Sequence, residues 1–247
     1  MEKSMNGYEK DPLKFLLSKN AFDVHRIRQI VTGRKYTAVL SDEHTIGVCA
    51  NFGAPVNTDK HHYSSIDPNT LSHRILLNAY FNSILNHVAP CFRDNGDIFD
   101  SIDFKHYEKI VMIGYFRPVA KKFKEKDIPL SIFDRRVCEE ILTPYGHKEK
   151  HLKQADAVIL TATSIFNGTF PEIIHTTKPA CDIFVLGPSA IMSVELFQYN
   201  NIHAIFGATF RPGDQSVLKA IANGGGTRSF LRYGTKCILK NKHHIFA

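Results

Sequence analysis

Short apolar runs alternate with helical stretches in the second half of the chain. The runs show no in-and-out alternation, which is typical of strands that are buried on both faces of a parallel sheet. Five such strands are predicted, over residues 109–114, 130–134, 157–161, 182–187 and 203–207. Helices are predicted over residues 119–126, 170–175, 192–199 and 215–222, and a last strand near 230–239. Right-handed crossovers between these strands give an α/β fold with a doubly wound, Rossmann-like parallel sheet.

The first half of the chain has a different pattern. Helices are predicted after Asp11-Pro12, over residues 21–31, and from Asp67-Pro68 to Pro90. A β-hairpin is predicted from strands 36–40 and 45–50 with a polar turn between them, followed by a long polar loop over 51–67. This combination describes a small α+β unit. The turn-forming run at 93–97 then favours a boundary near residue 105, with domains over 1–105 and 106–247.

Composition agrees with a globular chain of one large or two small domains. The chain has 247 residues, of which 43 % are hydrophobic and 22 % are charged. Lysine and arginine exceed the acidic residues by 31 to 24, and this net charge of +7 suits an anionic ligand. The basic residues are spread along the chain and form no stripe, so no nucleic-acid partner is expected.

The cysteines and the apolar runs predict a cellular location. The five cysteines, at positions 49, 91, 138, 181 and 237, form no CxxC pair and are odd in number. They are therefore expected to be reduced thiols and not a disulfide framework or a zinc ribbon. The N-terminal residues are too charged for a secretory signal, and the apolar run 110–116 is too short to cross a bilayer. We therefore expect a cytoplasmic protein without a membrane partner.

Ligands of open α/β sheets bind outside the carboxyl ends of the parallel strands. In this chain those ends carry small, hydroxyl, amide or acidic residues, which let a ligand approach the backbone and supply hydrogen bonds. The residues are Gly114, Asp134, Thr161, Thr163, Asn167, Thr169, Gly187 and Ser189. Each also has a purely structural interpretation. Gly114 could serve tight helix packing, Thr163 and Ser189 could be N-caps, and Asp134 could be a solvated loop acid.

Asp134 has the most specific spacing among these residues. It follows Gly114 by twenty residues, which is the spacing at which an acid binds a ribose hydroxyl in nucleotide-binding Rossmann folds. The GxGxxG fingerprint is absent, however, because Tyr-Phe-Arg-Pro follows Gly114. The sequence therefore does not favour a dinucleotide cofactor.

Three consecutive glycines and a threonine, Gly224 to Thr227, are costly in backbone entropy. They indicate a loop that passes close to a ligand or to another backbone segment, with a mobile connector to the last strand as the alternative.

The thirteen histidines do not form a recognisable metal site. His147 and His151 have i,i+4 spacing, but the charged segment between them favours a solvated turn. No HExxH motif, GxSxG elbow or GxxxxGK[ST] phosphate loop is present, and we expect no metal bound by the protein.

Four segments of this chain resemble the putative heavy-metal chelation family, a Rossmann-like domain of unknown function numbered 364. They are Val111 to Pro118, Ala155 to Thr169, Gly187-Pro188-Ser189 and Gly224 to Thr227. The first half, with Tyr36 to Val39 and the helix around Asn78-Ala79, resembles the usual N-terminal companion of that family, an enolase-N-terminal-like domain. The resemblance implies a small-molecule site between the two domains, a methyltransferase-like Rossmann part, and a role in making or handling metal-chelating compounds.

Carried onto this chain, the resemblance implies a ligand site with the loop 49–57 as one wall. Its residues would be Gly114, Phe116, Asp134, Thr161, Thr163, Asn167, Thr169, Gly187, Ser189, Gly226 and Thr227. Asp134 would hold a ribose, while Asn167 and the turn at 187–189 would bind carboxylate or amide groups. S-adenosylmethionine or another adenosine-containing ligand is the expected cofactor class.

Two functions follow from these expectations. The first is a small-molecule enzyme that condenses, hydrolyses or transfers a group on a metal-chelator, pterin- or siderophore-like metabolite. No residue is assigned as its general acid or base. The second is a non-catalytic protein that binds a metal or a metal chelate, with Cys49 and His61 or His62 as ligands. An exposed face of the N-terminal hairpin could also support a homodimer.

Overall fold

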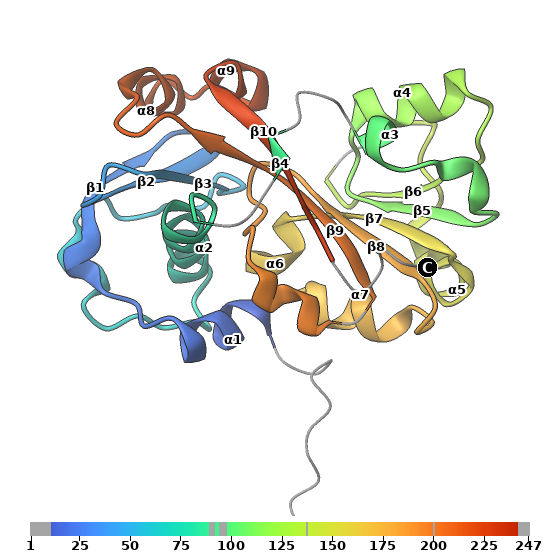
Figure 1. Ribbon diagram of the computed structural model, residues 1–247, viewed down its shortest axis with the longest axis horizontal. Coiled ribbons are helices and arrows are strands. Elements are labelled where there is room, and N and C mark those ends of the chain that lie inside the picture. Colours follow the sequence, from blue (N-terminus) through green and yellow to red (C-terminus); the bar gives the residue numbers. More distant parts are fainter. Residues whose placement is uncertain (1–10, 89–91, 94–97, 137, 200, 242–247) are drawn as a thin grey trace, which may run out of the picture.

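The computed structural model describes residues 11–88, 92–93, 98–136, 138–199 and 201–241, arranged around two β-sheets (Figure 1). The smaller sheet is antiparallel, with the order β1 (Ile27–Thr32), β2 (Tyr36–Ser41) and β3 (Ile46–Ala50). The larger sheet has seven strands in the order β4-β10-β9-β8-β7-β5-β6.

Five neighbouring strands of the larger sheet are parallel, as the apolar runs predicted. They are β5 (Ile110–Ile113), β6 (Ser131–Phe133), β7 (Ala157–Thr161), β8 (Asp182–Leu186) and β9 (Ile202–Phe210). Strand β10 (Gly234–Lys240) is antiparallel to β9, and β4 (Phe92–Arg93) is antiparallel to β10. From β5 the chain proceeds first to β6 on one side and then to β7 on the other, so the topological switch point lies between β5 and β7.

Helices cover both faces of the larger sheet, which confirms the predicted α/β class. One face packs on α3 (Ile98–Ser101), η4 (Phe104–His106) and α4 (Arg117–Glu125). The other face packs on η5 (Tyr145–His147), α5 (Lys148–Gln154), α6 (Thr163–Asn167), α7 (Phe170–Thr176) and η6 (Val194–Gln198).

The smaller sheet is enclosed by helices from both ends of the chain. Helix α2 (Leu71–Leu85) packs on β2 and β3 from one side. Helices α8 (Gln215–Ala222) and α9 (Thr227–Leu231) cover the opposite face (Figure 1). Val217 and Phe230 of these helices belong to one hydrophobic cluster with Leu40 and Val48. Helix α1 (Pro12–Lys19) and the short helices η2 (Val24–Arg26) and η3 (Lys60–Tyr63) complete this part. No described helix is both long and apolar enough to cross a membrane.

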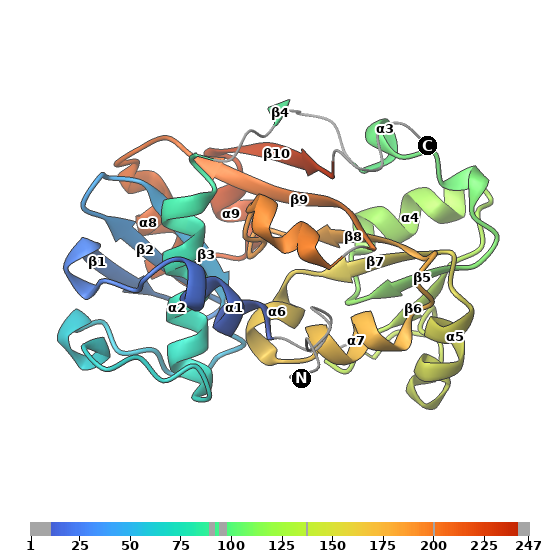
Figure 2. The same cartoon turned by 60° about the horizontal axis from the view of Figure 1, so that its bottom comes forward.

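Helix α2 is buried on nearly all sides and joins the two parts of the molecule (Figure 2). It carries a polar residue at every fourth position, namely Arg74, Asn78, Asn82 and Asn86 just beyond its end, and all four are buried. Asn78 Nδ2 donates to Ser189 O at 2.9 Å, and Asn86 Nδ2 donates to Ala190 O at 3.0 Å. These bonds hold the loop after β8 against α2.

Arg74 performs the same task for the loop after β7. Its Nε donates to Phe166 O at 2.6 Å and its Nη2 to Ile165 O at 2.7 Å, at the end of α6. The guanidinium also pairs with Asp11 Oδ2 at 2.6 Å, while Asp11 Oδ1 caps α1. Arg74 therefore fixes the short helix that presents Thr163 and Asn167.

Several predicted elements are corrected by the structure. The helix predicted over 21–31 is the short η2 followed by strand β1, and Phe230 belongs to α9, so that the last strand starts only at Gly234. The helix predicted over 192–199 is the 3₁₀ helix η6, and the turn predicted at 147–151 is the start of α5. Residues 94–97 of the predicted turn, together with Pro90 and Cys91, lie outside the described residues.

The segment 98–106 packs on the larger sheet, with Ile98 and Phe104 in one cluster with Met112. Neither the boundary near residue 105 nor the enolase-like origin of the first part is tested by this packing, and both stay predictions.

Candidate functional site

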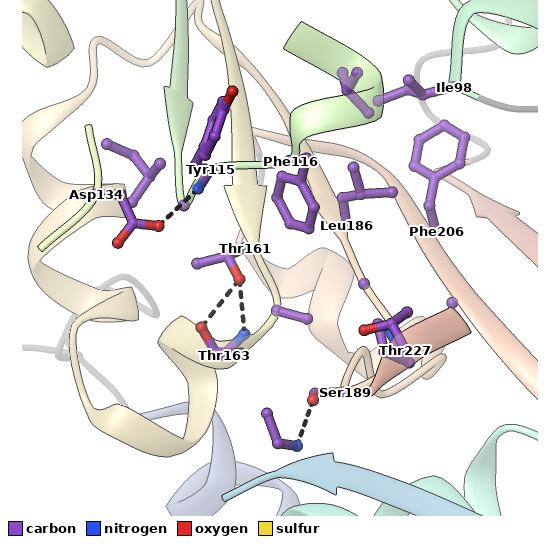
Figure 3. Close-up of a pocket in the computed structure, with 18 of the residues that line it drawn as sticks. Ile98, Tyr115, Phe116, Asp134, Thr161, Thr163, Leu186, Ser189, Phe206 and Thr227 are labelled. Carbon is purple, nitrogen blue, oxygen red and sulfur yellow. Dashed lines mark hydrogen bonds between the residues drawn. The ribbon is translucent and has the colours of Figure 1, made fainter. Parts of the chain in front are cut away.

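A cavity of about 790 Å³ lies along the carboxyl ends of the parallel strands (Figure 3). This volume is typical of small-molecule sites. The structure brings ten of the eleven predicted ligand residues into its lining: Gly114, Phe116, Asp134, Thr161, Thr163, Asn167, Thr169, Gly187, Ser189 and Thr227. Ala50 and Phe52, from the loop predicted as a wall, also line it. The ligand-binding role of these residues stays a prediction.

Gly226 is the exception, since it does not belong to the cavity lining. It is the N-cap of α9, and a Cβ built on it would point at the side chain of Lys35. Its neighbour Gly225 explains the glycine run, because a Cβ there would lie 2.5 Å from Ala220 O. The run therefore passes close to the backbone of α8, in agreement with the predicted approach to another backbone segment.

Gly114 directly follows β5 and has a φ of +89°, a conformation that favours glycine. A Cβ at this position would lie 2.7 Å from the Cβ of Thr161 at the end of β7. The glycine therefore lets the loop after β5 approach the end of β7, which brings the main chain of residues 114–116 to the cavity.

Asp134 is positioned by two backbone amides. Tyr115 N donates to Oδ2 at 2.7 Å (Figure 3). Arg136 N donates to Oδ1 at the same distance of 2.7 Å. A carboxylate has about four lone-pair positions, so two acceptor positions are left for a ligand. These two hydrogen bonds fix the carboxylate in one orientation at the edge of the cavity.

Hydroxyl and amide groups follow on the next strand. The hydroxyl groups of Thr161 and Thr163 lie 3.0 Å apart, and Asn167 Oδ1 accepts from the backbone N and the hydroxyl group of Thr169, at 3.0 and 2.7 Å. Because its oxygen is engaged in this way, Asn167 presents its amide N–H groups as donors.

Two contacts attach the smaller sheet to the cavity. Ser189 is 1 % exposed, and its hydroxyl group accepts from Ala50 N at 2.9 Å, so it connects the two sheets and is not an N-cap. The hydroxyl groups of Tyr36 and Thr227 lie 2.7 Å apart. Burial raises the pKa of Tyr36, although this hydrogen bond opposes the shift. Tyr36 is therefore a neutral phenol at physiological pH.

Basic side chains surround the cavity, and sequence reasoning did not identify them. Five basic residues belong to the lining, namely Lys122, Arg135, Arg136, Lys148 and Lys236. Among the described residues, Asp134 is the one carboxylate of the lining. Lys148 is paired with Glu172 at 2.6 Å, and Arg136 lies over the ring of Phe52 at 3.9 Å. The signal available in the sequence was the pair Arg135-Arg136 directly after the candidate ribose-binding acid.

The described residues do not fit a protein-bound heavy metal. No group of three or more His, Cys, Asp or Glu side chains among them is arranged to hold an ion. Cys49 is buried in β3, where its thiol donates to Ala50 O at 3.2 Å, and burial raises its pKa well above the usual value. His61 and His62 are exposed on η3. His151 packs on the ring of Phe133.

The thiols offer a direct test of this packing. In a Cys91→Ser variant at pH 8, we expect a maleimide to label the exposed Cys138 roughly 100-fold faster, or more, than the buried Cys49 or Cys181. The reason is that the maleimide reacts with the thiolate, which must form and be accessible. Burial, and secondarily Asp182, raise the pKa of Cys181 to about 12, so little thiolate forms there. Peptide mass spectrometry after timed labelling measures the three rates. Equal rates in the folded protein would contradict the described burial.

Comparison with solved structures agrees with this architecture. A protein of unknown function from the DUF364 family of Pyrococcus horikoshii is 18 % identical, with a TM-score of 0.75 over 94 % of this chain and 99 % of its own. A second DUF364 protein, from Desulfitobacterium hafniense, is 16 % identical, with a TM-score of 0.74 over 97 % of this chain and 100 % of its own. At these identities the likeness concerns the fold alone.

No curated protein matches the chain. The sequence profile of DUF364, described as "Putative heavy-metal chelation", matches residues 97–240, from α3 to the end of β10. The match covers more than half of the chain and contains the five parallel strands that form the cavity, and the chain therefore belongs to the DUF364 family.

Proposed function

We propose that this protein binds an anionic, adenosine-type small molecule in the cavity and transfers, condenses or hydrolyses a group on a second metabolite there. The observation that carries the proposal is the oriented carboxylate of Asp134 at the end of β6, hydrogen-bonded to Tyr115 N in the loop between β5 and α4. Carboxylates at the end of the second strand bind ribose hydroxyl groups in nucleotide-binding sheets.

The polar contacts of Asp134 support the ribose assignment. The two hydrogen bonds from backbone N–H groups hold the carboxylate as a rigid acceptor, and its remaining lone pairs suit two neighbouring hydroxyl groups. The ring of Tyr115 and the guanidinium of Arg135 belong to the same part of the lining and offer flat surfaces for a base.

The charge of the lining supports an anionic ligand. Helix α4 starts at Arg117 directly behind the loop after β5, and no side chain caps its first turn. Uncapped N–H groups and the helix dipole favour a phosphate or a carboxylate. Because the lining carries more cations than carboxylates, a nucleotide is favoured over the sulfonium of S-adenosylmethionine.

The chemistry of the lining favours catalysis by positioning. Thr161, Thr163, Asn167 and the backbone of 114–116 offer hydrogen-bonding groups around one space, which would orient two reactants toward each other. No residue is assigned as a general base. The metal chelation in the family description would then be a property of the metabolite, a reading that the lack of a ligand group among the described residues supports.

Isothermal titration with AMP tests the proposal. The wild-type protein is expected to bind AMP, and Asp134→Asn to bind it about 10- to 100-fold more weakly, because a hydrogen bond to a charged group is lost. The dideoxyribose counterpart of AMP should bind the wild type and the variant equally, since it lacks the hydroxyl groups that Asp134 would hold.

The control is Asp103→Asn, which changes an exposed acid outside the cavity lining and should leave AMP binding unchanged. An equal loss for AMP and for its dideoxyribose counterpart in Asp134→Asn would reject the ribose contact. Absence of binding by any adenosine ligand would reject the proposed function.

A further inference from the structure

We propose that the cavity has a second, apolar arm which receives an aromatic or aliphatic group of the ligand. The proposal rests on the proposed function, because it assigns a substrate class to the same cavity. It concerns the side of the cavity away from Asp134, where Ile98, Leu186 and Phe206 gather (Figure 3).

The floor of this apolar arm is formed by three neighbouring strands. Leu186 of β8, Phe206 of β9 and Ile238 of β10 all belong to the lining. Ile98 of α3 and Val119 of α4 line it from the side. Figure 3 shows Ile98, Leu186 and Phe206 gathered on the side of the cavity away from Asp134, with Phe116 between the two regions.

The apolar arm exists because two groups of helices cover different parts of the same face of β9. Ala204 and Phe206 pack in the cluster of α3 and α4. Ala208 and Phe210, further along the same face, pack in the cluster of α8 and α9. Both Phe206 and Ala208 also line the cavity, so the arm is the space where these two covers of the sheet meet.

The surroundings of the apolar arm determine what it can hold. Phe206 is 7 % exposed, Ile238 is 4 % exposed and Ile98 is 2 % exposed. Water in such a space finds few hydrogen-bonding partners, and a hydrocarbon group gains by replacing it. The arm is continuous with the polar part of the cavity, so one ligand can occupy both. We therefore assign the ligand to amphiphilic molecules that carry a polar, hydroxylated, anionic part and an apolar substituent.

Two series of probes test the apolar arm. The first contains adenosines with unbranched alkyl chains of increasing length, attached at the ribose end or on the base. The second contains benzoates with the same chains and no nucleoside. In both, the affinity should rise about two- to fourfold per methylene until the arm is filled, as expected for burial of hydrocarbon.

Variants of Val119 locate the effect. Val119→Trp fills the apolar arm and should abolish the gain with chain length in both series, each affinity being compared with that of the unsubstituted probe in the same variant. Val119→Ala enlarges the arm and should move the optimum to longer chains. Val194→Trp is the matched control, since Val194 is 55 % exposed and outside the lining, and it should keep the wild-type dependence.

The outcomes separate the two proposals. Affinities that are independent of chain length in both series, or a gain that persists in Val119→Trp, would overturn the apolar arm. If no adenosine binds but the benzoates gain with chain length, the apolar arm stands and the nucleotide function is rejected. If adenosine binds and longer chains add nothing, only the arm is rejected.

Discussion

Replacing Gly47 by alanine is expected to lower the free energy of unfolding by about 3 kcal/mol or more, and the melting temperature by about 6–12 °C. A Cβ on Gly47 would lie 2.1 Å from Ala79 O and 2.2 Å from Ser83 N. Both atoms belong to the backbone of α2, so no side-chain rotation can relieve the overlap. The helix would have to move away from β3, and the bond from Asn82 Nδ2 to Val48 O, at 2.7 Å, would lengthen.

Chemical denaturation with circular dichroism measures this change. Gly146→Ala is the matched control, because a Cβ there meets nothing within 4 Å and the residue has no positive φ. We expect that control to stay within about 0.5 kcal/mol of wild type. A Gly47→Ala variant as stable as Gly146→Ala would show that α2 does not pack on β3 as described.

Arg74→Met is the second substitution for which we expect a large effect, about 3–5 kcal/mol of destabilisation. The variant keeps the aliphatic bulk but leaves the Asp11 carboxylate unpaired and removes the donors to Ile165 O and Phe166 O. Because Arg74 holds the end of α6, affinity for any ligand that contacts Thr163 or Asn167 should fall as well. Urea unfolding and ligand titration measure the two effects.

A double-mutant cycle separates the charge from the carbonyl contacts. Asp11→Asn preserves the cap of α1 and removes the charge, so the double variant with Arg74→Met should recover part of the lost stability. Arg26→Met is the control, since Arg26 pairs with Glu43 on the surface and should cost less than about 1 kcal/mol. A small effect of Arg74→Met, comparable to this control, would contradict the buried network.

The larger sheet could be predicted because its strands are buried on both faces. Runs such as Ala157 to Leu160 are continuously apolar, and no helix of that length competes with this interpretation. The loops at the carboxyl ends followed from the same strands, so the eight ligand residues predicted there lie around one cavity; Phe116 and Thr227, which the family resemblance implied, line it as well. The carboxyl ends of parallel strands must meet at one edge, whatever the details of packing.

The smaller sheet was harder to predict because β1 is irregular. The register between β1 and β2 shifts between Ile27 and Gln29, and Ile27 and Ile30 are buried while the two residues between them are exposed. This spacing of three imitates an amphipathic helix. A bulge is decided by the partner strand, and no local pattern reveals it.

The basic lining and Ser189 show a second limit of prediction. Lys122, Lys148 and Lys236 come from α4, α5 and β10, and only the packed fold brings them to one cavity. Ser189 reads as a helix cap in the sequence, but its partner, Ala50 N, is 139 residues away. The i,i+4 row of asparagines along α2 was a local signal that could have predicted an interface.

The hydrogen-bond partners of the polar residues along α2 have a consequence for how the sequence can change during evolution. Arg74, Asn78 and Asn86 donate hydrogen bonds to main-chain oxygens of residues 165–166 and 189–190. Every amino acid has such an oxygen. Side chains in those facing loops can therefore be exchanged without breaking the junction. The edge of the cavity is free to acquire new specificities while the scaffold behind it keeps its shape.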